Sequence, residues 1–145
     1  MPVLRGELTN LIWGPLVLLK SSPRISGGLS WGLALAILYL SLTPLSELPE
    51  VAGGDKTHHL IAYAALAFPN ALARPQKIVF FAVIYACFGG GIELIQPYAN
   101  RYASWLDFAA NLGGIFIGSY GGIVAGRYLS QRISAGEYPR DEERS

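Results

Sequence analysis

The sequence predicts an all-α, polytopic membrane protein, a bundle of four transmembrane helices with a short interfacial segment at its N-terminus. Of the 145 residues, 52% are hydrophobic and 14% are charged, whereas soluble domains carry about 25% charged residues. Glycine, which is more frequent in transmembrane helices than in soluble ones, contributes 17 residues. Charged residues also bracket four apolar runs, each close to the length that a membrane requires. Together these features favour a helical membrane protein over a soluble or disordered chain.

The first and last apolar runs carry no charge from end to end. They cover residues 25–46 and 108–126. A helix that crosses the hydrocarbon core of about 30 Å needs roughly 20 residues, at about 1.5 Å per residue. Both runs meet that requirement, so each is expected to form a spanning helix.

The two middle runs are less uniform. Residues 60–73 are short alone but nearly long enough if the helix begins at Asp55. The run that begins at Ile78 carries one carboxylate, Glu93, near its end. With these two helices, we expect a four-helix transmembrane domain over residues 25–129.

The two ends of the chain are expected to lie outside the bundle. Residues 8–19, within the N-terminal segment 1–24, are too short to span, and Gly14-Pro15 is expected to break them, so the segment is predicted to be interfacial. It lacks the small-x-small pattern of a signal-peptide cleavage site. Residues 130–145 form a polar tail that is expected to be disordered.

The distribution of basic residues predicts the orientation, because cytoplasmic loops are enriched in Lys and Arg. Only Lys56 and Arg101 fall in the two loops that would face outward. The other basic residues place both termini and the middle loop in the cytoplasm, as expected of a multi-pass plasma-membrane protein. These residues are Arg5, Lys20, Arg24, Arg74, Lys77, Arg127, Arg132, Arg140 and Arg144.

This topology brings polar residues from distant positions to the outer ends of the helices. Their spacings of three or four residues place members of each helix on a common face. Polar groups in membrane helices normally face the bundle interior. We therefore predict a ligand-binding polar cluster, although each residue could instead pair locally or cap a helix. The candidates are Asp55, Lys56, His59, Tyr63, Glu93, Gln96, Arg101, Asp107 and Asn111.

These residues resemble the VanZ-like family of bacterial integral membrane proteins. "DKTHHLIAY" is similar to an Asp-Lys-x-x-His-x-x-x-Tyr pattern, and "ELIQ", Arg101 and "DFAANLGGIFIG" are similar to a second motif that follows it. The turn "PYANR" before Arg101 is shorter than in many members. The resemblance implies a multi-spanning envelope protein, but it implies no known reaction and no antibiotic resistance.

Three functions remain open. In the first, the cluster binds a lipid headgroup or lipid-linked envelope precursor, and Lys56 and Arg101 hold its phosphate or carboxylate. In the second, the chain is a structural or partner-binding subunit. In the third, it is a membrane enzyme that uses His59 with Glu93 or Asp107.

The sequence gives little reason to expect a cofactor, a metal or a nucleic-acid partner. The two histidines are adjacent, and no pair of metal ligands at His-x-x-x-His spacing is present. The single cysteine, Cys87, excludes an intramolecular disulfide and a Cys-based metal site. The net charge is only +1.

Glycines recur at every fourth position of the last predicted helix. Such a stripe lets another helix approach closely. The partner is expected to be a helix of the same bundle or of a second copy, which would make a homo-oligomer. The stripe consists of Gly114, Gly118, Gly122 and Gly126.

Overall fold

The computed structural model describes residues 13–43 and 54–135, in which every regular element is helical. A helix over residues 13–21 precedes four longer ones, and two 3₁₀ turns flank α4. The elements are α2 (Pro23–Leu42), α3 (Asp55–Ala73), η2 (Pro75–Lys77), α4 (Ile78–Ile95), η3 (Gln96–Ala99) and α5 (Trp105–Ser134).

Three helical stretches are long and apolar enough to cross a membrane, namely Pro23–Leu42, Pro75–Ala99 and Trp105–Ser134. The prediction of an all-α protein with membrane-spanning helices is therefore confirmed to that extent for the described residues. α3, the other predicted span, is not among the three.

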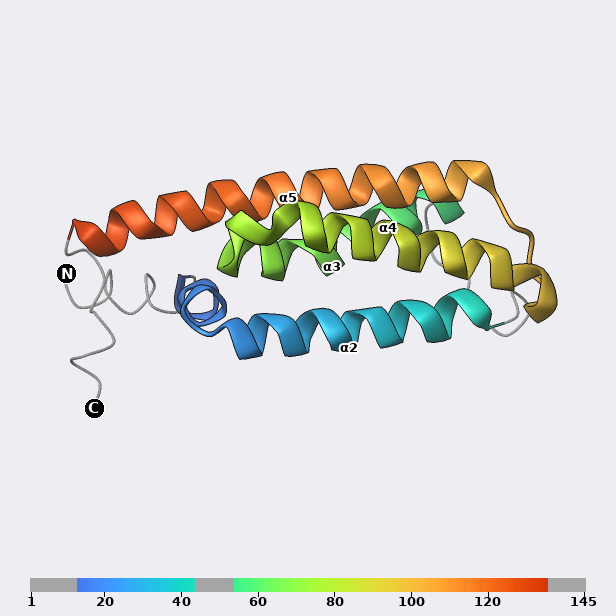
Figure 1. The fold of residues 1–145 in the computed structure, drawn as a ribbon, viewed down its shortest axis with the longest axis horizontal. Coiled ribbons are helices and arrows are strands. Elements are labelled where there is room, and N and C mark those ends of the chain that lie inside the picture. The colour runs from blue at the N-terminus through green and yellow to red at the C-terminus, as the bar shows by residue number, and fades with distance from the viewer. Residues whose placement is uncertain (1–12, 44–53, 136–145) are drawn as a thin grey trace.

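Helices α2 to α5 run in alternating directions along the long axis of the molecule (Figure 1). The end of α2, the start of α3, the end of α4 and the start of α5 consequently lie together, and we call this the polar end. The opposite end holds the helix 13–21 and the last turns of α5.

Helix α3 is the most enclosed element of the bundle and contacts α2, α4 and α5. Its core side chains are at most 1% exposed. A helix that faces protein rather than lipid can carry more polar residues, which explains why α3 is less apolar than its neighbours. The buried apolar side chains are Tyr63, Leu66, Ala67, Ala71 and Leu72.

The glycine stripe of α5 packs directly on the backbone of α3. A Cβ atom on Gly118 would lie 2.1 Å from the Ala64 carbonyl oxygen, and one on Gly114 would lie 2.3 Å from that of Leu60. Only glycine permits this approach. The stripe is therefore occupied by a helix of the same chain, and this face of α5 is not available to a second copy.

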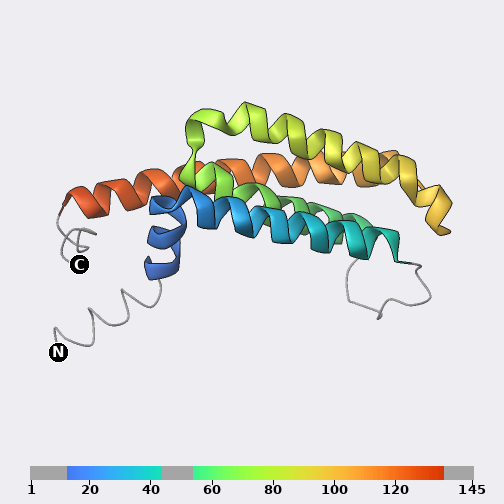
Figure 2. The ribbon, with the colours of Figure 1, turned by 60° about the horizontal axis from the view of Figure 1, so that its bottom comes forward.

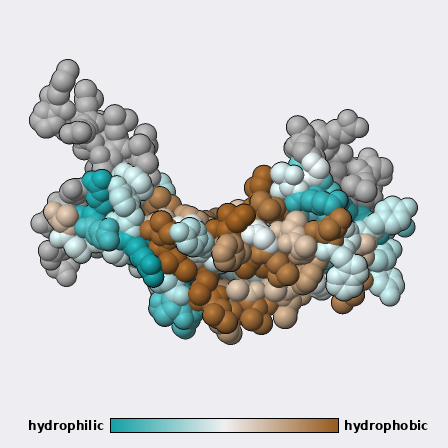
Figure 3. Space-filling view, turned by 90° about the horizontal axis from the view of Figure 1, so that it is seen from above, coloured by the Kyte–Doolittle hydropathy of each residue, from teal (hydrophilic) through white to brown (hydrophobic). Residues whose placement is uncertain are grey.

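The outside of the bundle is apolar along its middle. Large side chains such as Trp31, Phe80 and Phe116 are 61–73% exposed. Figure 3 shows apolar residues over the middle of one face and hydrophilic residues toward both ends. This distribution is typical of a surface that faces lipid.

The helix 13–21 leaves the start of α2 at a steep angle (Figure 2). Its described part begins at residue 13, so Gly14 and Pro15 lie in the first turn described, where proline is well accommodated. The predicted break of the segment 8–19 at this pair stays a prediction. Val17 packs with Leu72 and Leu129, and the rings of Trp13 and Tyr128 lie 5.4 Å apart. Residues 8–12 of the predicted interfacial segment lie outside the described residues.

Two predicted boundaries differ from the structure. α2 begins at Pro23 rather than at residue 25, because proline is well accommodated in the first turn of a helix. α5 continues to Ser134, so the tail predicted to begin at residue 130 is helical at its start. Arg132 stabilises this last part by donating to the Tyr128 hydroxyl, 2.9 Å away. Residues 136–145 lie outside the described residues.

Candidate functional site

The polar end gathers most of the predicted site residues into one group. α3 contributes three of them, α4 and η3 contribute two, α5 contributes two, and Arg101 comes from the turn before α5. All are buried except Asp55, whose side chain is 51% exposed. We call this group the polar cluster: Asp55, His59, Tyr63, Glu93, Gln96, Arg101, Asp107 and Asn111.

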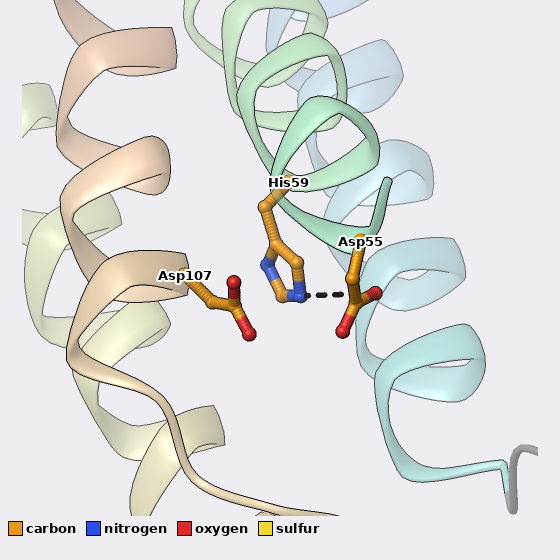
Figure 4. A group of neighbouring side chains, drawn as sticks. All are labelled: Asp55, His59 and Asp107. Atoms are coloured by element: carbon orange, nitrogen blue, oxygen red, sulfur yellow. Dashed lines mark ion pairs between the residues drawn. The ribbon is translucent and has the colours of Figure 1, made fainter. Parts of the chain in front are cut away.

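His59 lies at the centre of the polar cluster. Its Nδ1 is 2.9 Å from Asn111 Oδ1. Because a carbonyl oxygen only accepts hydrogen bonds, Nδ1 donates in this contact, and Nε2 is the ring nitrogen that remains for another partner. Nε2 faces Asp55 Oδ1 at 3.9 Å, and Asp107 lies on the other side of the ring (Figure 4).

Gly89 of α4 gives Tyr63 and Asn111 the space they occupy. A Cβ atom at this position would lie 3.0 Å from the Tyr63 hydroxyl and 3.1 Å from Asn111 Nδ2. Both side chains are almost fully buried. Gly91, two residues later, has nothing within 4 Å of such an atom. Of these two glycines, Gly89 is therefore the one that shapes the site.

Arg101 is turned inward by the residue before it. Asn100 adopts a left-handed conformation, with φ of 54°, which asparagine tolerates better than most residues. The Arg101 guanidinium then donates to the carbonyl oxygens of Leu40 and Thr43, each at 3.1 Å. These carbonyls, at the end of α2, lack helical partners. A second guanidinium nitrogen lies 3.6 Å from Asp55 Oδ1.

Lys56 lies outside the polar cluster. Its side chain is exposed, and no hydrogen bond or ion pair joins it to the cluster within the described ranges. Arg101 is already engaged by backbone carbonyls and Asp55. The two cations that were expected to hold an anion together are therefore not assembled for that purpose.

Ser104 is a residue of the site that sequence reasoning passed over. Its backbone N–H donates to Glu93 Oε2 at 3.0 Å, and its hydroxyl accepts from the backbone N–H of Asp107 at 3.4 Å. The signal was present, because Ser104-x-x-Asp107 has the spacing of a helix capping box. Ser104 thus caps the N-terminus of α5 and also holds the Glu93 carboxylate in place.

Several buried polar atoms of the cluster have no hydrogen-bond partner within the described part of the chain. Leaving a buried donor or acceptor unpaired costs about 1–3 kcal/mol. Polar side chains that only hold helices together are normally hydrogen-bonded to one another, so a cluster of unpaired polar atoms at one end of the bundle is unusual. The atoms are Tyr63 OH, Glu93 Oε1, Gln96 Oε1, Asp107 Oδ1 and Asn111 Nδ2.

A second polar group, which the sequence analysis missed, lies deeper in the bundle. Asn70 Nδ2 donates to Ser30 Oγ at 2.9 Å and to the Tyr85 hydroxyl at 2.7 Å. Ser30 in turn donates to the Leu66 carbonyl oxygen. An asparagine inside an apolar run is the signal that could have revealed it. Most of its hydrogen-bonding groups are paired, which is typical of a structural contact between helices.

Comparison with models of known protein families, with curated proteins and with solved structures found no match. The function is therefore inferred from the polar cluster alone. Its carboxylates and imidazole can bind a cation. Its unpaired donors and acceptors can also bind hydroxyl or amine groups.

Proposed function

We propose that this chain is a VanZ-like integral membrane protein of the bacterial envelope, which crosses the plasma membrane four times. Its polar cluster binds the headgroup of a membrane lipid or of a lipid-linked envelope precursor. The observation that carries this proposal is the set of buried, unpaired polar atoms at the polar end.

The length and position of α3 support the fourth span. Its 19 residues extend for about 28 Å, close to the thickness of the hydrocarbon core. It lies between helices that are themselves long and apolar enough to cross. Charged residues flank it, with Asp55 and Lys56 at one end and Arg74 at the other.

Charge and aromatic residues support an outward-facing polar end. Most basic residues of the described ranges lie at the opposite end, as expected for the cytoplasmic side. Tyr98, Tyr102 and Trp105 are 87–90% exposed around the polar end, where amphipathic rings would meet lipid headgroups. Both termini of the chain would then be cytoplasmic.

The chemistry of the unpaired atoms favours a headgroup with hydroxyl or amine groups. Glu93, Gln96 and Asp107 offer acceptors, whereas Tyr63 and Asn111 offer donors. Because Lys56 is outside the cluster and Arg101 is engaged, these two cations do not provide the phosphate contact expected from the sequence. A purely structural subunit would be expected to pair such groups with one another.

Lipid retention by purified protein tests this function. The full chain is washed repeatedly in mild detergent, and the lipids that remain are identified by mass spectrometry. Tyr63→Phe removes one unpaired hydroxyl without changing the size of the ring. It is expected to lower the retained amount of one lipid class severalfold.

The matched control is Tyr98→Phe, which removes an exposed hydroxyl at the same end outside the cluster. It is expected to leave lipid retention unchanged. Equal lipid content in the wild type and both variants would contradict headgroup binding by the cluster.

A further inference from the structure

Three metal-ligating side chains meet at the mouth of the polar cluster. Asp55, His59 and Asp107 each offer one ligand atom, and these atoms all lie within 4.8 Å of one another. The distance of 3.9 Å between His59 Nε2 and Asp55 Oδ1 is too long for a hydrogen bond. It is shorter than twice the usual bond of about 2.1 Å between zinc and nitrogen or oxygen. A cation bound to both atoms therefore fits between them.

The charges around this space favour a cation. His59 Nε2 faces the Asp55 carboxylate, the Asp107 carboxylate lies on the other side of the ring, and one ligand atom of each residue lies within 4.8 Å of the other two (Figure 4). Asp107 is only 5% exposed, and its Oδ1 has no partner among the described residues. Arg101 reaches Asp55 but makes no ion pair with Asp107 within the described ranges. A buried, uncompensated carboxylate is strongly unfavourable, and a metal ion would neutralise it.

The surroundings of His59 are typical of a metal ligand. In metal sites, a ligating histidine usually donates its other ring N–H to a fixed acceptor, which sets the tautomer and orientation of the ring. Asn111 Oδ1 is that acceptor here, at 2.9 Å from Nδ1. Asn111 is itself fully buried between α3 and α4, next to Gly89. The His59 ring is thus held with Nε2 directed toward Asp55.

We propose that Asp55, His59 and Asp107 bind one divalent transition-metal ion of the Zn²⁺ class. One imidazole and two carboxylates suit such an ion, and three protein ligands leave a coordination position open. The two ligands on α3 are one helical turn apart, and the fold brings the third, Asp107 of α5, close to them. This site goes beyond the proposed binding of a headgroup and does not depend on it.

Metal titration of the full chain in detergent tests the site. The protein is delipidated by exhaustive detergent washing, stripped with a chelator, dialysed and titrated with Zn²⁺. Bound metal is measured by elemental analysis. The wild type is expected to bind about one ion per chain. Asn111→Ala, which frees the His59 ring, is expected to weaken binding by roughly 10–100-fold, and His59→Ala by more.

The adjacent histidine provides a matched control. His58 is exposed, and no hydrogen bond or ion pair joins its side chain to the cluster within the described residues, so His58→Ala is expected to bind Zn²⁺ like the wild type. Asp55→Asn is a second ligand variant at a half-exposed position, where loss of folding is not expected. It should also weaken binding by at least about tenfold.

Two results would overturn the proposal. One is the absence of stoichiometric Zn²⁺ uptake by folded wild-type protein. The other is uptake that stays at the wild-type level in both Asp55→Asn and His59→Ala. Because the titration uses delipidated protein, its outcome is independent of whether a lipid headgroup binds.

Discussion

The two halves of the contact between α3 and α5 are built in opposite ways. In the half toward the polar end, Asp55, His59 and Tyr63 of α3 share a group of side chains with Asp107 and Asn111 of α5. Many of their polar atoms are buried without partners. In the other half, Gly118 and Gly122 of α5 lie directly on the α3 backbone.

This difference shows how the bundle can maintain an unfavourable group of charges. The glycine half brings the two backbones close enough to fix the spacing and rotation of the helices. The polar side chains of the other half are then held at fixed distances from one another, and they do not have to stabilise the contact between α3 and α5. Residues that hold a site open normally reduce stability, and another part of the fold compensates for that loss.

The largest expected effect comes from disturbing the glycine half. A Cβ atom on Gly118 would lie 2.1 Å from the Ala64 carbonyl oxygen, so Gly118→Ala must push the helices apart. We expect the free energy of unfolding in detergent to fall by about 2 kcal/mol or more. Denaturant titration followed by circular dichroism measures this change.

Gly121→Ala is the control on the same helix. Its Cβ atom would lie 3.8 Å from the Phe68 ring, an ordinary contact. The change in stability should stay within about 1 kcal/mol. If Gly118→Ala and Gly121→Ala had the same free energy of unfolding, the close contact between α3 and α5 would not be what stabilises the packing of these two helices.

A smaller effect is expected from the polar half. Asp107→Asn removes a buried charge, which is favourable, but also a negative charge in the first turn of α5, which is unfavourable. These contributions oppose each other, so the unfolding free energy of the metal-free protein should change by less than about 1 kcal/mol. In contrast, Asn70→Ala, which breaks formed hydrogen bonds, should lower it by about 1–3 kcal/mol.

Asp107→Asn and Asn70→Ala also distinguish whether the polar cluster is a binding site or a structural contact. If the polar cluster only held the helices together, Asp107→Asn would destabilise the protein at least as strongly as Asn70→Ala. That result, seen in thermal unfolding of the two variants side by side, would favour the structural subunit.

The helices were largely predictable from the sequence, because charged residues mark where each apolar run begins and ends. The start of α3 at Asp55 was also predicted, since its polar residues recur at helical spacing. The meeting of distant polar residues at one end followed from the alternating direction of four helices. These features depend on composition and periodicity, which a sequence displays directly.

The inward or outward direction of individual side chains was not predictable. Arg101 points inward because Asn100 takes a left-handed conformation, whereas Lys56 points outward from the first turn of α3. The helix that packs on the glycine stripe of α5 was also not predictable, because the sequence does not show which helices lie side by side. Asp55, His59 and Asp107 were predicted to belong to the polar cluster, but a metal was not expected there, because only the fold shows that their ligand atoms lie within 4.8 Å of one another.

The side of the membrane on which the polar end lies is the most direct test of the account. Cys87 is replaced by serine, and single cysteines are placed at the exposed positions Lys56, Tyr102 and Gln76. Intact cells are then treated with a thiol reagent that does not cross membranes. Four spans with an outward polar end predict labelling at positions 56 and 102, and labelling at position 76 only after the cells are opened. Labelling of positions 56 and 102 from opposite sides would contradict the four-span bundle and the polar cluster with it.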